Sequence, residues 1–260
     1  MLASLASLVA PEARIFLYGT GYAEAPPYPY WPATQVAQAI YRAVDEGADI
    51  IVTDAAFDLD LTTLREACQF AYEKNAIIVA PNGEGMKASE AASYPSSYAT
   101  TISVAAVVPA ADGKAIPWDQ SQPAVTTSVA APAAVGVGAS PSPSASLAPG
   151  NAQAATLCAG LAALVSSRIP KDGSELPGQY FQRVREILLR TASTQALGFE
   201  TFDPRVGNGL INAEAAVTVG VETHRAKMNK IQADFDKRLK SIRQEAEKQK
   251  KAKAQSPRNP

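Results

Sequence analysis

Histidine and cysteine, the side chains that most often bind metal ions through nitrogen and sulfur, are nearly missing from this sequence. It contains one histidine, His224, and two cysteines, Cys68 and Cys158, among 260 residues. No group of His, Cys and Asp residues has the spacing of a metal site, so we expect no metal and no cofactor. Both cysteines lie in apolar helical patterns and are expected to be small buried hydrophobic residues. A disulfide between them is an alternative that the sequence does not support.

Long apolar runs are missing as well. No stretch approaches the roughly 18 consecutive apolar residues of a membrane-spanning helix, so we expect none. Residues 1–9 are apolar, but they have neither the basic start nor the length of a signal peptide, and we expect them to end a core helix. With 47% hydrophobic and 19% charged residues, the composition is that of a globular protein with room for one large core and an appendage. It indicates no compartment.

Charge is distributed unevenly along the chain. Residues 222–260 contain 12 Lys and Arg against 5 Asp and Glu, a net charge of +7, whereas the rest of the chain carries 12 against 20, a net charge of −8. The same segment contains no proline before Pro257 and has a helix-forming composition. Apolar residues recur along it at spacings of 3 and 4: Met228, Ile231, Phe235, Leu239 and Ile242.

This narrow apolar seam has two interpretations. The helix either folds back on its own body or projects and docks on another protein, and we favour the second. The seam is short for an independent coiled coil, so we expect a larger protein surface as its partner. The Lys-rich residues 248–253 have no aromatic side chains beside them to stack on bases, which argues against a nucleic-acid partner.

Before this tail, short apolar strands alternate with amphipathic helices. We expect strands at residues 13–18, 49–53, 76–80 and 101–107, and helices from Thr34 (as N-cap) to Gly47, from Thr62, at 152–167 and at 179–192. This pattern predicts an α/β fold with three layers, in which helices cover both faces of a mostly parallel sheet. Residues 131–149, rich in small residues and proline, are either a linker or a loop beside a functional site.

The run from Gly150 to Val165 resembles a motif of a known enzyme family. It is similar to the nucleophile loop and buried helix of the subtilisin-like serine proteases (subtilases, peptidase S8), which read Gly-Thr-Ser-x-Ala-x-Pro-His-x-Ala-Gly with serine as the nucleophile. Here Ala152 stands at the serine position, whereas Ala159 and Gly160 keep the packing positions.

Four further segments resemble subtilases in the same order along the chain. They are Ala10–Ala13, similar to Val-Ala-Pro-x-Ala; residues 76–107, similar to the oxyanion region; Ser128–Pro132, similar to Ile-Ala-Ala-Pro-Gly; and Gly207–Val217, similar to Gly-x-Gly-Leu-Ile-Asn-Ala-Glu-Ala-Ala. The resemblance implies a subtilisin-like domain over residues 1–220, truncated at its N-terminus. A basic amphipathic helix and tail over residues 221–260 would follow it.

The resemblance also implies that the catalytic residues are lost. The family's aspartate and histidine precede the matched region, and His224 lies far away in the tail. Gly83 stands where the oxyanion asparagine is expected, and Asn82 is one position early. The substrate-binding Ser-Leu-Gly segment is replaced by Asp54–Ala56. Together with Ala152, whose methyl group cannot attack a carbonyl, these changes imply a pseudoprotease.

A gap in the sheet is a further implication. In subtilases the aspartate strand lies between the strand that matches residues 13–18 and the one that matches residues 50–52. An interior edge left open is an aggregation hazard. One hypothesis is that a separate chain, such as the N-terminal half of a split subtilase, completes this sheet. A remodelled smaller sheet and a natural start further upstream are the alternatives.

These observations predict a catalytically inactive pseudoprotease that acts as a structural or scaffolding subunit of a larger protein assembly, docked through its C-terminal helix. Two alternatives stay open. One is a serine-type endopeptidase completed by another chain, against which Ala152 argues, because supplied residues cannot restore a missing hydroxyl. The other is a module that binds peptides in the old cleft without cleaving them.

Overall fold

The computed structural model describes residues 2–20, 31–85, 92–133 and 149–255, without the side chain of residue 31 and of most residues after 230. Five strands form its sheet: β1 (Ile50–Val52), β2 (Ile77–Pro81), β3 (Thr101–Pro109), β4 (Ala115–Pro117) and β5 (Val129–Pro132). The neighbours run β1-β2-β3-β4, and β5 also pairs with β3. All pairs are parallel except the short β3–β4 pair. The sequence-based prediction of a mostly parallel sheet is confirmed.

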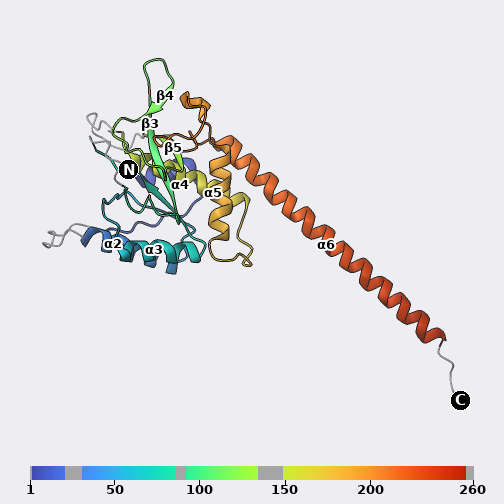
Figure 1. Ribbon diagram of the computed structural model, residues 1–260. Helices are drawn as coiled ribbons and strands as arrows, with labels where there is room; N and C mark the ends of the chain where they lie inside the picture. Colours follow the sequence, from blue (N-terminus) through green and yellow to red (C-terminus); the bar gives the residue numbers. More distant parts are fainter. Residues whose placement is uncertain (1, 21–30, 86–91, 134–148, 256–260) are drawn as a thin grey trace.

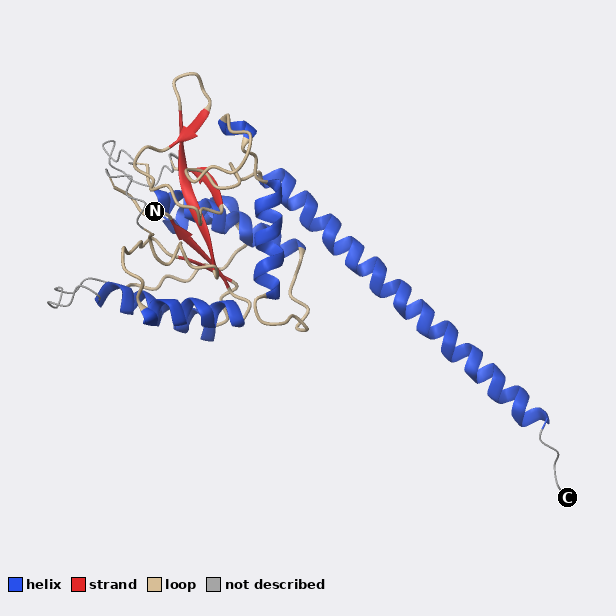
Figure 2. Ribbon diagram, viewed as in Figure 1, coloured by secondary structure: helices blue, strands red, loops and turns tan. Residues whose placement is uncertain are grey.

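Helices cover both faces of this sheet (Figures 1 and 2). On one face, α2 (Trp31–Asp45) and α3 (Thr62–Glu73) pack together in a core that includes Ile40, Leu64 and Ile78. On the other face, α4 (Asn151–Arg168) and α5 (Gln179–Thr191) share a larger core with the strands. Alternate residues of β2 point to opposite faces, because a strand has a period of two, and both faces are therefore apolar.

The central element is α4, which is apolar all round and contacts β1, β2, β3 and β5. Its outer side is covered by α1 (Leu2–Val9), so the opening residues are helical as predicted, and Leu5 is the buried residue of this helix. The close approach depends on Gly160, since a Cβ there would lie 2.7 Å from the Cβ of Val9. A glycine is needed where two helices come this close.

A buried asparagine joins the start of α4 to the sheet. The side chain of Asn151 is 0% exposed; its Nδ2 donates to the carbonyls of Asn82 and Gly83 at 3.0 Å each, just after β2. Its Oδ1 accepts from the backbone N–H of Ala106 in β3 at 2.8 Å. One carboxamide thus satisfies three backbone groups that would otherwise be buried without partners.

The last helix, α6 (Ala213–Gln255), begins on the body and then runs away from it (Figure 1). Asn212 accepts a hydrogen bond from the N–H of Ala215 and caps the helix. Ala216 is fully buried, and the first turns pack on α4 and α5. Lys227 pairs with Asp172, and this hydrogen-bonded ion pair holds the pKa of Asp172 below its usual range. The helix is continuous across the 220/221 boundary predicted from the sequence.

Two local predictions are wrong. Residues 13–18 form no strand, and Ile15, Phe16 and Leu17 are 38%, 61% and 80% exposed. An apolar run becomes a strand only when a neighbour hydrogen-bonds with it, and no described strand pairs with this segment. Thr34 is not a cap, because α2 already begins at Trp31; Pro32 lies in its first turn, where the missing N–H leaves no helical hydrogen bond unmade.

One prediction concerns a segment of which the structure describes only the ends. The 131–149 segment, interpreted as a linker or a functional loop, lies largely outside the described residues, and neither interpretation is tested. Across the part of the chain that the structure describes, no helix is both long and apolar enough to cross a membrane.

Replacing Asn151 by alanine is expected to cost roughly 3 kcal/mol of unfolding free energy, because it orphans buried backbone donors and acceptors. Asn212→Ala is the matched control. It removes an asparagine from an exposed helix start and is expected to cost about 1 kcal/mol. Urea unfolding followed by circular dichroism measures both, and equal losses would contradict the role given to Asn151.

Both cysteines are buried and free, and burial raises the pKa of each thiol to about 12. Because the thiolate is the reactive form, the native protein should react very slowly with Ellman's reagent. The unfolded protein should release two equivalents of thionitrobenzoate, one for each cysteine. Absence of free thiols in guanidinium chloride would indicate a disulfide instead.

Candidate functional site

The site begins where the sheet meets the first turn of α4. Ala152 is the second residue of this helix and is partly exposed. Its neighbour Asn151 is hydrogen-bonded to the carbonyls of Asn82 and Gly83. The structure therefore brings together the three positions that the sequence analysis selected as vestigial. What Ala152 presents there is a methyl group, which has no proton to give and no lone pair for attack.

The amide of Asn82 is turned inward and fully used. The residue is 1% exposed. Its Nδ2 donates to the carbonyl of Gln122 at 3.1 Å and to Oγ1 of Thr127 at 2.9 Å, and its Oδ1 accepts from the hydroxyl of Ser103. Both amide hydrogens are thus engaged with protein atoms. In this arrangement Asn82 has no donor left for a ligand beside Ala152.

At Gly83 the space for a side chain is taken by another residue. A Cβ at position 83 would lie 2.0 Å from Oε1 of Gln122 and 2.7 Å from its Cδ. Backbone bonds hold this arrangement: the N–H of Gln122 donates to the carbonyl of Gly83, and the N–H of Gly83 donates to Oγ of Ser93, each at 2.9 Å. The sequence analysis missed Gln122, because no local pattern links it to Gly83.

Glu84 is the second residue that the sequence analysis missed. Its Oε1 accepts a hydrogen bond from the backbone N–H of Asn151 at the start of α4. Gly150, the N-cap position, supplies no side-chain cap of its own. A carboxylate at a helix N-terminus is favourable, because the unpaired N–H groups and the helix dipole are positive there.

The remaining predicted residues lie apart from this cluster. Asp54–Ala56 follow β1, at the same end of the parallel sheet as residues 82–85. His224 lies on α6, one turn after Gly220. Gly220 packs against the far end of α4: a Cβ added to it would lie 3.4 Å from the Cβ of Arg168. Val165, in that last turn, is 13 positions after Ala152, so about 20 Å lie between them at a rise of 1.5 Å per residue. His224 is too far away to act as a base at Ala152.

The predicted docking seam is described only in part. Met228 is 50% exposed on α6. The side chains of Ile231, Phe235, Leu239 and Ile242 lie outside the described residues. Within the described portion of the chain, no three His, Cys, Asp or Glu residues gather in a way that could hold a metal ion.

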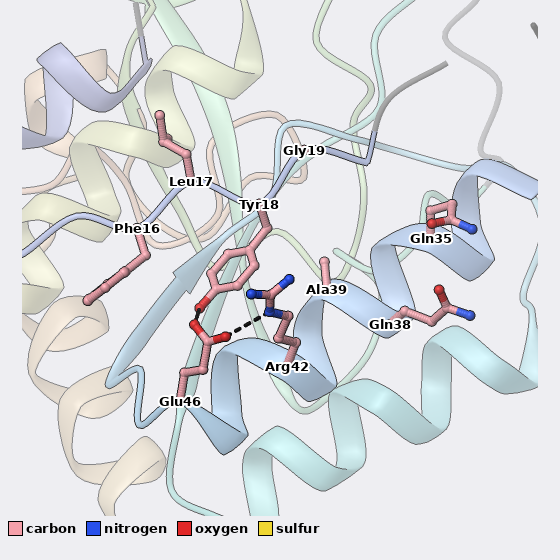
Figure 3. A pocket seen from close by; sticks show the side chains of 9 residues that line it. All are labelled: Phe16, Leu17, Tyr18, Gly19, Gln35, Gln38, Ala39, Arg42 and Glu46. Atoms are coloured by element: carbon pink, nitrogen blue, oxygen red, sulfur yellow. Dashed lines mark hydrogen bonds and ion pairs between the residues drawn. The ribbon is translucent and has the colours of Figure 1, made fainter. Parts of the chain in front are cut away.

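A cavity of about 360 Å³ lies in a different place, between residues 16–19 and α2 (Figure 3). Tyr18 closes one side of it by donating its hydroxyl to Glu46, at 2.6 Å, and Arg42 donates to the other oxygen of Glu46. These two hydrogen bonds lower the pKa of Glu46. None of the vestigial positions lines this cavity.

Solved structures share this fold. A lanthipeptide protease aligns with a TM-score of 0.65 at 17% identity, over 84% of this chain and 74% of its own. Fervidolysin from Fervidobacterium pennivorans, a keratinolytic enzyme related to subtilisin, aligns with a TM-score of 0.59 at 22% identity, over 72% of this chain. This chain spans only 29% of fervidolysin.

A third structure, the MycP3 protease of the type VII (ESX-3) secretion system, aligns with a TM-score of 0.59 at 25% identity, over 80% of this chain and 66% of its own. A comparison with curated protein sequences found no match. The sequence model of the subtilase family, however, matches residues 4–209, which is most of the chain. This protein belongs to the subtilase family.

Proposed function

We propose that this chain is a catalytically inactive subtilase that serves as a structural or scaffolding subunit of a larger protein assembly. The observation that carries the proposal is Ala152 in the first turn of α4, where the family motif has its serine. Without a side-chain oxygen no acyl-enzyme can form, whatever other residues a partner supplies. The inward-turned amide of Asn82 supports the same conclusion, since both of its hydrogens are bound to protein atoms and cannot serve a developing oxyanion.

The projecting helix α6 supports the assembly role. It leaves the body after the Lys227–Asp172 pair, and beyond that point Figure 1 shows no other part of the described chain beside it. A lone helix in water gains little from propensity alone and is stabilised mainly by packing an apolar face. The seam of Met228, Ile231, Phe235, Leu239 and Ile242 provides such a face. We propose that it docks on another protein.

The edge of the sheet supports a second contact. Among the described residues, β1 pairs with β2 alone, so its outer backbone groups have no strand partner. Phe16 and Leu17 are exposed, and they line the cavity between residues 16–19 and α2 that Figure 3 shows. An open edge with exposed apolar side chains is suited to accept one more strand. We propose that a separate chain, such as the N-terminal half of a split subtilase, completes the sheet there.

A fluorophosphonate probe tests the loss of activity. The chain, alone or in its native complex, is expected to take up no label and to cleave no peptide, because position 152 has no hydroxyl. An active serine protease of the same family is the positive control. Labelling of this chain at any serine near Ala152 would overturn the proposal in favour of an active endopeptidase completed by another chain.

Native mass spectrometry of the chain purified from its own source tests the assembly role. A complex with other chains is expected. It should be lost in a Phe235→Asp, Leu239→Asp double variant, because two charges in the seam abolish its apolar face. Ala233→Asp, Lys237→Asp is the matched control: it has the same spacing on exposed positions and should keep the complex. A folded 27.2 kDa monomer under mild conditions would contradict the subunit role.

A further inference from the structure

Glu84 connects two segments that are far apart in the sequence. Its backbone forms an isolated antiparallel β-bridge with Ser121. Two backbone hydrogen bonds flank this bridge: the N–H of Gly85 donates to the carbonyl of Gln120 at 3.0 Å, and the N–H of Gln122 donates to the carbonyl of Gly83 at 2.9 Å. These bonds hold residues 83–85 in place beside α4. From this position the carboxylate reaches the backbone N–H of Asn151, 67 residues further along the chain.

The contact satisfies a need that α4 cannot meet locally. The first N–H groups of a helix have no partners within the helix, and they carry its positive end. Gly150 has no side chain with which to cap them. A Cβ added at Gly150 would lie 3.2 Å from Oε1 of Glu84, so the carboxylate sits directly against this turn. A charged acceptor makes a stronger hydrogen bond here than a neutral carbonyl would.

Glu84 lies against the residues that precede Ala152, and Gln122 lies against Gly83. Glu84 takes the N–H of the residue before Ala152, and Gln122 fills the volume beside Gly83. The asparagine amides of this region are both engaged inward: Asn82 with Thr127 and the Gln122 carbonyl, Asn151 with the carbonyls of residues 82 and 83. A peptide carbonyl that approached the start of α4 would find the N–H of Asn151 already bound by a carboxylate.

We propose that Glu84 is an internal ligand of the α4 N-terminus and that this contact excludes extended peptides from the old cleft. The contact is independent of the scaffolding role, because it concerns the cleft beside Ala152 and neither α6 nor the edge of β1. It also decides between the alternatives for this cleft: the wild-type chain does not bind peptides there, and removal of the Glu84 carboxylate opens it.

Chemical rescue tests the contact itself. Glu84→Ala is expected to lower the melting temperature, and sodium acetate should raise it again relative to sodium chloride at equal ionic strength, because acetate can replace the missing carboxylate. The wild type should show no such difference between the two salts. Glu200→Ala, which removes an exposed carboxylate with no contact described here, is the matched control and should respond to neither salt.

Peptide binding tests the exclusion. The probe is a pool of fluorescein-labelled, C-terminally amidated hexapeptides, titrated with protein and followed by fluorescence anisotropy. Glu84→Ala should bind the pool about 10-fold more tightly than the wild type and the Glu200→Ala control, as expected when one charge-assisted competitor is removed. Glu84→Gln keeps the size of the side chain without its charge and serves as a second folded variant.

Equal binding by the wild type and both Glu84 variants, or no binding by variants whose circular dichroism is native, would overturn the exclusion. Absence of an acetate-specific effect on Glu84→Ala would overturn the internal contact. Neither result bears on the fluorophosphonate or mass-spectrometry experiments, so this inference and the proposed function fail separately.

Discussion

The structure depends on the buried carboxamide of Asn151. At the point where the central helix begins, it satisfies two carbonyls after β2 and one N–H of β3. A buried polar group without a partner is costly, so these three elements have to meet with their polar atoms matched. The apolar packing of α4 against the sheet supplies most of the stabilisation, but packing alone is non-directional. Asn151 gives the helix a defined position relative to the ends of the strands.

Hydrogen bonding also engages the other polar side chains around the start of α4. In a catalytic cleft, donors are held ready for a group that is absent until substrate binds. Here the amides of Asn82 and Asn151 and the carboxylate of Glu84 are hydrogen-bonded to neighbouring protein atoms. Groups that are already bound in this way offer little to a ligand. The change at Ala152 and the inward polar network therefore agree, although they involve different residues.

The core and the projecting helix belong to different parts of the chain. The acidic body contains the two apolar layers on either side of the sheet, whereas the basic helix α6 is attached to it through the buried Ala216 and the Lys227–Asp172 pair. The packing positions of α4, such as Gly160 against Val9, are distinct from position 152, so the residue at 152 does not determine how the core packs.

The amino-acid sequence by itself predicted strands at 49–53, 76–80 and 101–107, which the structure has at 50–52, 77–81 and 101–109, together with the helices between them and the position of Ala152 in the family motif. Hydrophobic periodicity and a family motif are local patterns, so they can be read from the sequence. Its predictions were wrong at residues 13–18, where an apolar run has no described strand to pair with, and at Thr34, because α2 already begins at Trp31. Only the tertiary structure decided that Asn82 is turned inward, that Gln122 fills the space at Gly83, and that Glu84 reaches Asn151. These contacts join residues far apart in the chain, and a hydrogen bond depends on distance and direction in space, which no local pattern specifies.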